Sequence, residues 1–252
     1  MGLCGEIHNF DFAVTHNYQV ESFSGSGWAE LVVGDSFPNA DLLNIHLDQR
    51  WEKCVLNEHI YRRDLPPVVS KLRDYVPRWV PMMVRYAPRL RWFAQRNFNT
   101  RRITSRNELL YPTTKHFDFR KRGKPIWDLF ELFVPTHRAA DFVRSARKYI
   151  LKFEHVYNTT VRDIQESQAI MRYSKGPTRG FVTMIRKHEN NAELIRELID
   201  VALDHGGTYY LPYDMHATVS QFRLGYPRWE YFKSFVVPSM QTEWSKKYLG
   251  II

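Results

Sequence analysis

The sequence predicts an α+β fold, because segments typical of strands and of helices occur together along the chain without an internal repeat. Residues 125–135 form a nearly continuous aromatic and apolar run, which is typical of a buried strand. Residues 137–153 repeat apolar residues at helical spacing, with Phe142 and Ile150 on the inward side, and residues 192–204 show a second such face. Of the 252 residues, 44% are hydrophobic and 15% aromatic, so the chain can bury a core.

The first part of the chain is less regular. Residues 1–21 alternate apolar and polar side chains and predict strands. Residues 22–27 are rich in serine and glycine and predict a loop, and residues 28–33 predict a short strand. Residues 42–56 fit either a strand or a helix, and the choice stays open.

Further elements follow. Residues 65–99 contain five prolines, which exclude one long helix and predict several short ones. Residues 156–164, 169–173 and 180–185 are predicted strands.

Residues 206–228 contain the most specific local pattern. Gly206 and Gly207 predict the end of the preceding helix, with glycine in a left-handed conformation. A strand is predicted from Thr208 to Tyr213, and Thr218 or Ser220 is predicted to cap a short helix that ends before Tyr226. The strand and its exit loop carry four polar aromatic side chains that alternate between two sides: Tyr209, Tyr210, Tyr213 and His216. One of these sides is expected to line a cavity.

The net charge of +9 is concentrated in one segment, residues 62–124, which we call the basic aromatic region. It has 17 Lys or Arg against 4 Asp or Glu, a surplus of 13, so the rest of the chain is near −4. Its expected partner is an anionic membrane surface or an acidic protein, or the region is an ordinary solvated face; nucleic acid is disfavoured because no nucleic-acid fold signature accompanies the charge. The residues expected to contact a membrane or partner are Arg78, Trp79, Arg85, Arg89, Arg91 and Trp92.

Several classes of protein are disfavoured. The chain has no phosphate-binding loop, nucleophile elbow, HExxH motif or zinc-type cluster, so a metal is not expected. Its two cysteines, Cys4 and Cys54, suit a reducing compartment, where we expect both to be structural. Because neither a signal peptide nor a long apolar window is present, we expect a cytoplasmic protein that can bind peripherally to a membrane.

Residues 206–228 resemble the C-terminal region of FAD-dependent oxidases of the vanillyl-alcohol oxidase superfamily, in the group of aldonolactone and alditol oxidases such as D-arabinono-1,4-lactone oxidase. That group carries a similar Gly-Gly-x-x-Tyr-Leu-x-Tyr-x-x-x-Ala-Thr-x-x-Gln-Phe stretch that continues into Tyr-Pro-Arg. Residues 2–7 resemble the last strands of the family's FAD-binding domain, residues 127–135 resemble the start of its cap domain, and residues 159–184 match in the same order. Residues 35–120 match poorly.

The resemblance implies that residues 1–21 are the terminal strands of a FAD-binding domain and that residues 22–252 form a substrate or cap domain. In the cap domain an antiparallel sheet is covered by helices on one side. The rest of the FAD-binding domain would be a separate chain or a missing segment, so this chain alone is not expected to hold FAD.

The implied reaction is oxidation of a hydroxyl carbon in a sugar-derived, lactone or similar small-molecule substrate. The residues expected to face substrate or flavin are Arg162, Tyr210, Tyr213, His216 and Thr218. A surface ion pair is an equal alternative for Arg162. No general base is identified, because Thr160 stands where some relatives have an acid. The alternative function is a non-catalytic protein that docks on an acidic partner or a membrane through the basic aromatic region.

Overall fold

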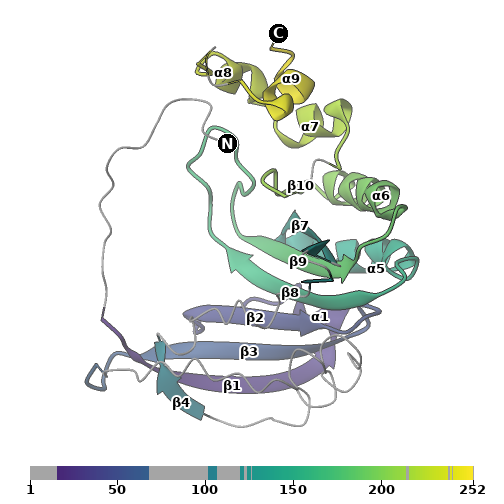
Figure 1. Cartoon of the computed structure of the whole chain (residues 1–252). Helices are drawn as coiled ribbons and strands as arrows, with labels where there is room; N and C mark the ends of the chain where they lie inside the picture. The colour runs from purple at the N-terminus through teal and green to yellow at the C-terminus, as the bar shows by residue number, and fades with distance from the viewer. Residues whose placement is uncertain are drawn as a thin grey trace.

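The computed structural model describes residues 16–67, 102–106, 120–121, 124–125, 127–213, 216–237, 239 and 241–251. Eight strands lie in this part of the chain: β1 (Gln19–Trp28), β2 (Leu42–Leu47), β3 (Lys53–Arg62), β4 (Arg102–Ser105), β7 (Trp127–Pro135), β8 (Val156–Ile164), β9 (Thr178–Arg186) and β10 (Thr208–Tyr209). They form one sheet in the order β10-β7-β9-β8-β2-β3-β1-β4 (Figure 1). All of its strand pairs are antiparallel. A separate short pair joins β5 (Arg120–Lys121) and β6 (Lys124–Pro125).

The described helices are α1 (Ala29–Val32), η2 (Thr136–Arg138), α5 (Ala139–Ile150), α6 (Asn191–Asp204), α7 (Val219–Gly225), α8 (Trp229–Lys233) and α9 (Glu243–Leu249). α1, α5 and α6 pack on one face of the sheet, and α7 to α9 gather beyond α6 near the C-terminus (Figure 1). The predicted antiparallel sheet with helices on one side is therefore confirmed. None of the helices in the described ranges is both long enough and apolar enough to cross a membrane.

One hydrophobic core fills the space between the sheet and the helix layer. It extends from Ala29 at the start of α1 to Leu249 at the end of α9. α5 buries its predicted inward side, including Phe142 and Ile150, against this core. Trp51, in the turn between β2 and β3, is fully buried between Phe142 and Phe181. Segments far apart in the sequence thus share one interior.

A buried arginine joins distant parts of the chain. The Nε of Arg179, in β9, donates to the carbonyl oxygen of Val33 over 2.9 Å, and its guanidinium also contacts the carbonyl of Asp35 and pairs with Asp163. Burial lowers the pKa of Arg179 to about 10, so this side chain is still charged at neutral pH. Arg179 therefore fixes the end of α1 against the edge of the core.

Most predicted elements are confirmed. Residues 127–135, 156–164 and 178–186 are strands, and residues 139–150 and 191–204 are helices. Gly206 has the expected left-handed backbone, with φ of 74°. Thr218 caps α7 in a reciprocal capping box with Gln221.

Three predictions are wrong. Residues 22–27 are the middle of β1 and not a loop, because their small polar side chains bond to the neighbouring strand. Residues 28–33 contain the helical turn α1 and not a strand. The spacing of apolar residues in so short a run does not distinguish a helix from a strand. Residues 169–173 belong to the loop between β8 and β9, where Met171 is buried by side-chain packing without a strand ladder.

The remaining expectations are partly confirmed or lie outside the described residues. The open segment 42–56 contains β2 and the start of β3. The predicted strand after Gly207 is only the two residues of β10. Residues 1–15 and most of residues 65–99 lie outside the described part, so the strands and short helices expected there stay predictions. The division at residue 21 also stays a prediction; β1 runs across it within one sheet.

Candidate functional site

The sheet face that points away from α1, α5 and α6 is lined by polar side chains. In β7, Phe130 and Leu132 point into the helix-side core, so Glu131 between them points to the other face. Strand register places the following side chains on that same face: Ser22, Ser24, Asn44, His46, Asn57, His59, Asn158, Thr160 and Arg162. We call this surface, together with Glu131, the polar sheet face.

Hydrogen bonds across neighbouring strands order the polar sheet face. The Ser22 hydroxyl lies 2.8 Å from Nδ1 of His59, and the Ser24 hydroxyl donates to Oδ1 of Asn57 over 2.7 Å. Burial lowers the pKa of His59, so its imidazole is neutral at neutral pH. Such a surface offers fixed donors and acceptors to a ligand rich in hydroxyl groups.

Glu131 is the carboxyl group at the β7 side of this face. Burial raises the pKa of Glu131, while the nearby Arg162 guanidinium and a hydrogen bond from the Tyr213 side chain act in the opposite direction. The net direction is upward, toward the range in which a carboxyl group can exchange protons with a substrate near neutral pH. Glu131, Arg162 and Tyr213 come from β7, β8 and the segment after β10, and the fold brings them together.

Gly180 in β9 makes room for this arrangement. Gly180 lies opposite Phe133 of β7 on one side and opposite Arg162 of β8 on the other. A Cβ atom at Gly180 would lie 3.3 Å from Oε1 of Glu131 and 2.9 Å from Cγ1 of Ile164. Because glycine has no side chain, the Glu131 carboxyl group can extend across β9 toward the Arg162 strand.

The tyrosines close one end of the site. The Tyr210 amide donates to the carbonyl oxygen of Glu131 over 2.9 Å, and the rings of Tyr210 and Tyr213 meet edge to face with centroids 4.9 Å apart. Tyr173 stacks on Phe133 at 4.8 Å and also faces Tyr210. Burial, followed by the negative Glu131, raises the pKa of Tyr213, so its hydroxyl keeps its proton and can donate to the carboxyl group.

The structure places the five predicted site residues in two groups. Arg162, which is exposed, and Tyr213 lie near enough to Glu131 to act on its pKa, and the Tyr210 amide bonds to its backbone. His216 lies elsewhere: its Nε2 is 3.7 Å from Oδ1 of Asp128, a residue on the helix side of β7. Thr218 is exposed, and its hydroxyl accepts the Gln221 amide as the cap of α7. For all five residues, the expected contact with substrate or flavin stays a prediction.

Sequence reasoning missed Glu131. The signal was present, since Glu131 is a carboxylate inside an otherwise apolar and aromatic strand, where a charged residue requires a partner. Its partners, however, are far away in the sequence. In the described ranges no group of three or more His, Cys, Asp or Glu side chains is placed to hold a metal ion. The site is therefore built from a carboxyl group, a guanidinium group and phenols.

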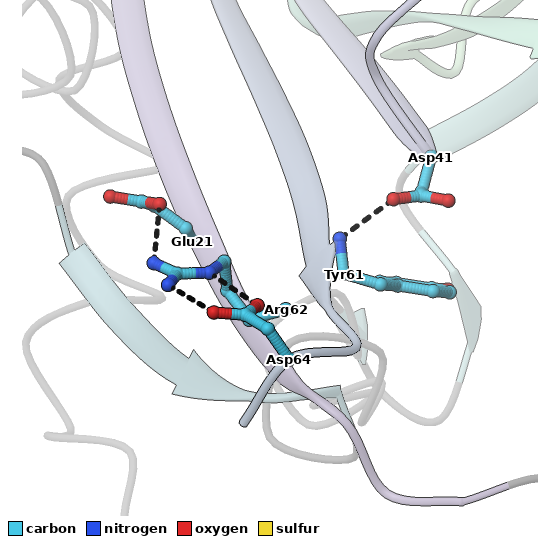
Figure 2. Close-up of polar contacts among 5 residues, drawn as sticks. All are labelled: Glu21, Asp41, Tyr61, Arg62 and Asp64. Carbon is cyan, nitrogen blue, oxygen red and sulfur yellow. Dashed lines mark hydrogen bonds and ion pairs between the residues drawn. The ribbon is translucent and has the colours of Figure 1, made fainter. Parts of the chain in front are cut away.

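The basic aromatic region is described only in short pieces, residues 62–67, 102–106, 120–121 and 124. Figure 2 shows Arg62 bonded to both Glu21 and Asp64, while Asp41 accepts the Tyr61 amide. Arg63 also pairs with Asp41. The first two arginines of the region are therefore already paired with acids in β1 and next to β2 and β3. Four expected contact arginines and two tryptophans lie outside the described residues: Arg78, Trp79, Arg85, Arg89, Arg91 and Trp92.

The fold and site define an α+β protein in which one face of an antiparallel sheet is packed by helices and the other presents a carboxyl-centred polar surface. Among solved structures, this chain is similar to a Bermuda grass isoallergen of the pollen group 4 allergens, with TM-score 0.42 and 10% identity over 78% of this chain and 44% of that one. It is similar to a variant of berberine bridge enzyme described as a reticuline dehydrogenase, with TM-score 0.38 and 7% identity over 77% and 42%. It is also similar to aclacinomycin oxidoreductase, with TM-score 0.36 and 7% identity over 76% and 42%.

The chain spans less than half of the length of each of these three structures. No family model matches the sequence, and a search of curated proteins gives no match.

Proposed function

We propose that this chain is the substrate-binding, or cap, portion of a FAD-dependent oxidoreductase that oxidises a hydroxyl carbon of a sugar-derived, lactone or similar substrate. FAD would be held by a separate or missing FAD-binding domain. The observation that carries the proposal is the Glu131 carboxyl group, whose pKa is raised by burial and which lies beside Arg162 and Tyr213 on the polar sheet face. The resemblance of residues 206–228 to aldonolactone and alditol oxidases supports the same substrate class.

The polar sheet face fits the substrate side of a flavin site. Its hydroxyl, amide and imidazole groups suit a substrate with several hydroxyls, and its carboxyl group supplies a proton acceptor. FAD, when bound, takes a hydride from the alcohol carbon. The protein side of the reaction is then the transfer of the substrate's hydroxyl proton to a carboxylate oxygen of Glu131.

Three side chains share this work. Glu131 accepts the hydroxyl proton as the carbon–oxygen bond becomes a carbonyl. Tyr213 donates a hydrogen bond that orients the carboxyl group, and Arg162 stabilises negative charge on the carboxylate and on the substrate oxygen. The flanking Tyr210 ring limits the access of water to the pair.

The test uses the tagged chain purified natively from its own cells, so that any FAD-binding partner stays attached. We expect a yellow preparation whose flavin band is bleached without oxygen by an alditol or an aldonolactone. Glu131→Gln should keep the flavin and slow the bleaching by about 100-fold or more, the usual contribution of a general base. Glu154→Gln, which changes an exposed carboxylate before β8, is the matched control and should bleach at the normal rate.

A colourless preparation, or a flavin that no polyol or lactone reduces, would overturn the proposed function. Normal bleaching by Glu131→Gln would instead remove Glu131 from the mechanism.

The second candidate function is a non-catalytic protein that docks on an anionic membrane or an acidic partner. One observation favours it, the surplus of 13 positive charges in residues 62–124. Three described arginines of that region already have internal partners: Arg62, Arg63 and Arg106. Two results together would favour this alternative. The chain purified from its own cells would contain no flavin, and it would bind vesicles of anionic lipid in a salt-dependent way.

A further inference from the structure

A separate pocket lies where β7 ends and β9 begins. It has a volume of about 230 Å³ and is bounded by Pro135, Thr178 and the segment Gly206–Thr208 that joins α6 to β10. The loop between β8 and β9 rises toward β10 (Figure 1). Residues of this loop also line the pocket. Glu131, Arg162 and Tyr213 do not line this pocket, but it borders the candidate site, because Phe133 and Tyr173 belong to both.

The lining of this pocket is cationic. Arg172, Lys175 and His137 face it, and no carboxylate is among its lining residues in the described part of the chain. A neighbouring hollow of about 170 Å³ shares Arg172 and Lys175 and adds Arg228. Arg172 has an acidic neighbour, Glu166, but the closest approach, from Nη1 to Oε1, is a loose 3.6 Å. The two hollows are neighbours, and three permanently charged side chains line one or both of them: Arg172, Lys175 and Arg228.

Two buried polar atoms of this pocket are short of hydrogen-bond partners. Nε of Arg172 has none within the described residues. The Thr208 side chain is only 6% exposed, and its hydroxyl has just the Tyr226 phenol beside it. Burial raises the pKa of that phenol, and the contact with Thr208 acts in the opposite direction. The Tyr226 hydroxyl itself donates to the carbonyl of Tyr209, so it supplies no proton to Thr208. A buried donor without an acceptor is costly, and an oxyanion in the pocket would accept from Arg172 Nε and lies within the reach of the Thr208 hydroxyl.

The chain packs so closely beside Thr208 that two positions require glycine. A Cβ at Gly225 would lie 2.8 Å from Thr208 Oγ1, and a Cβ at Gly207 would lie 2.1 Å from the carbonyl oxygen of Phe133. Any larger residue at Gly225 would therefore occupy the space beside the hydroxyl.

We propose that this pocket binds the oxyanion group, phosphate or carboxylate, of a small molecule. Arg172 and Lys175 supply the charge and Thr208 supplies a neutral hydrogen bond, while the rest of the ligand extends toward Arg228 in the adjoining hollow. The inference stands apart from the proposed oxidation, because it requires no flavin and can be tested on the chain alone.

The test is calorimetric titration of the purified chain with inorganic phosphate, pyrophosphate and malonate, each against sodium chloride at equal ionic strength. We expect at least one of the three oxyanions to bind, and we expect Lys175→Ala and Thr208→Val each to weaken it by about tenfold. Lys175 is exposed on a loop, so its replacement should leave the fold intact. Lys187→Ala, an exposed lysine just after the far end of β9, is the matched control and should bind normally.

The pattern among the probes identifies the chemistry. Binding of phosphate or pyrophosphate without malonate would assign a phosphorylated ligand, and binding of malonate would assign a carboxylate. If none of the three binds more tightly than chloride, or if Lys175→Ala binds as well as Lys187→Ala, the proposal is overturned.

Discussion

Glu131 is a carboxyl group whose burial raises its pKa, so the folded chain holds a proton at this position more tightly than the unfolded chain does. The stability that this group contributes is present below its ordinary pKa, where both states are protonated. It is lost as the pH rises through the raised pKa of the folded state, because the buried carboxyl group must then ionise. At neutral pH, Glu131 therefore lowers the free energy of unfolding.

Because Glu131 lowers the free energy of unfolding at neutral pH, its replacement in Glu131→Gln has a predictable effect. The amide keeps the size and hydrogen-bonding capacity of the protonated acid, so the variant should melt at a higher temperature than the natural protein at about pH 7. The difference should shrink toward zero at about pH 4, where the natural carboxyl group is protonated as well. Thermal unfolding followed by circular dichroism at both pH values measures this. Glu154→Gln should show no such pH-dependent gain, and a lower melting temperature for Glu131→Gln at neutral pH would contradict the assignment.

The sequence could predict part of this site. Arg162, Tyr210 and Tyr213 follow from the resemblance of their segments to flavin oxidases, since each stands at a position of a recognisable pattern. The role of Glu131 is not predictable in this way, because it depends on two spatial neighbours: Arg162 on β8 and Gly180 on β9, which has no side chain. A single sequence contains no record of which strands are neighbours, so the environment that shifts a pKa is not predictable from it.

At the scale of elements, β10 depends on how closely the chain passes over β7. The Gly207 backbone lies so near β7 that a Cβ would be 2.1 Å from the Phe133 carbonyl oxygen and 2.8 Å from that of Ala202. We expect Gly207→Ala to push β10 away from β7 and to destabilise the protein by about 2 kcal/mol or more. Gly25→Ala is the control, because its Cβ would meet nothing within 4 Å. Urea unfolding of the two variants measures the difference; equal midpoints would show that β10 adapts freely.

The same contrast explains which elements were predictable. α5 and α6 carry apolar faces at helical spacing over 12 and 14 residues, so local pattern alone defines them. β1 is different, because Ser22, Ser24 and Gly25 are typical of loops, and the strand exists because His59 and Asn57 of β3 provide partners for the serines. Short or serine-rich segments take their structure from neighbours that the sequence does not identify.

At the scale of the whole molecule, the sheet interleaves distant parts of the chain. β2 lies between β3 and β8, so Asn44 pairs opposite Arg162 and Leu47 opposite Thr159. Arg179 connects the end of α1 to β9 in the same way. Because the N-terminal strands and the C-terminal half share one sheet and one core, we expect them to unfold together.

Trp51 is the side chain that tests this cooperativity. Its indole Nε1 donates to Thr159 of β8 over 3.0 Å, and its ring packs against Phe142 of α5 and stacks on Phe181 of β9. Its backbone φ of 55° is left-handed, a conformation that a bulky residue adopts only when packing offsets the strain. Trp51 thus links the β2–β3 turn to both layers of the fold.

We expect Trp51→Ala to lower the free energy of unfolding by about 4 kcal/mol, the usual cost of removing a buried tryptophan, and the melting temperature by roughly 12 °C. Trp28→Ala removes the same side chain from a position that is 57% exposed, and it should cost about 1 kcal/mol or less. Hydrogen exchange measured by mass spectrometry should show β3 and α6 losing protection together in Trp51→Ala, since both belong to one core. Loss of protection confined to β1, β2 and β3, with α5 and α6 unchanged, would mean that the two parts of the sheet fold as independent units.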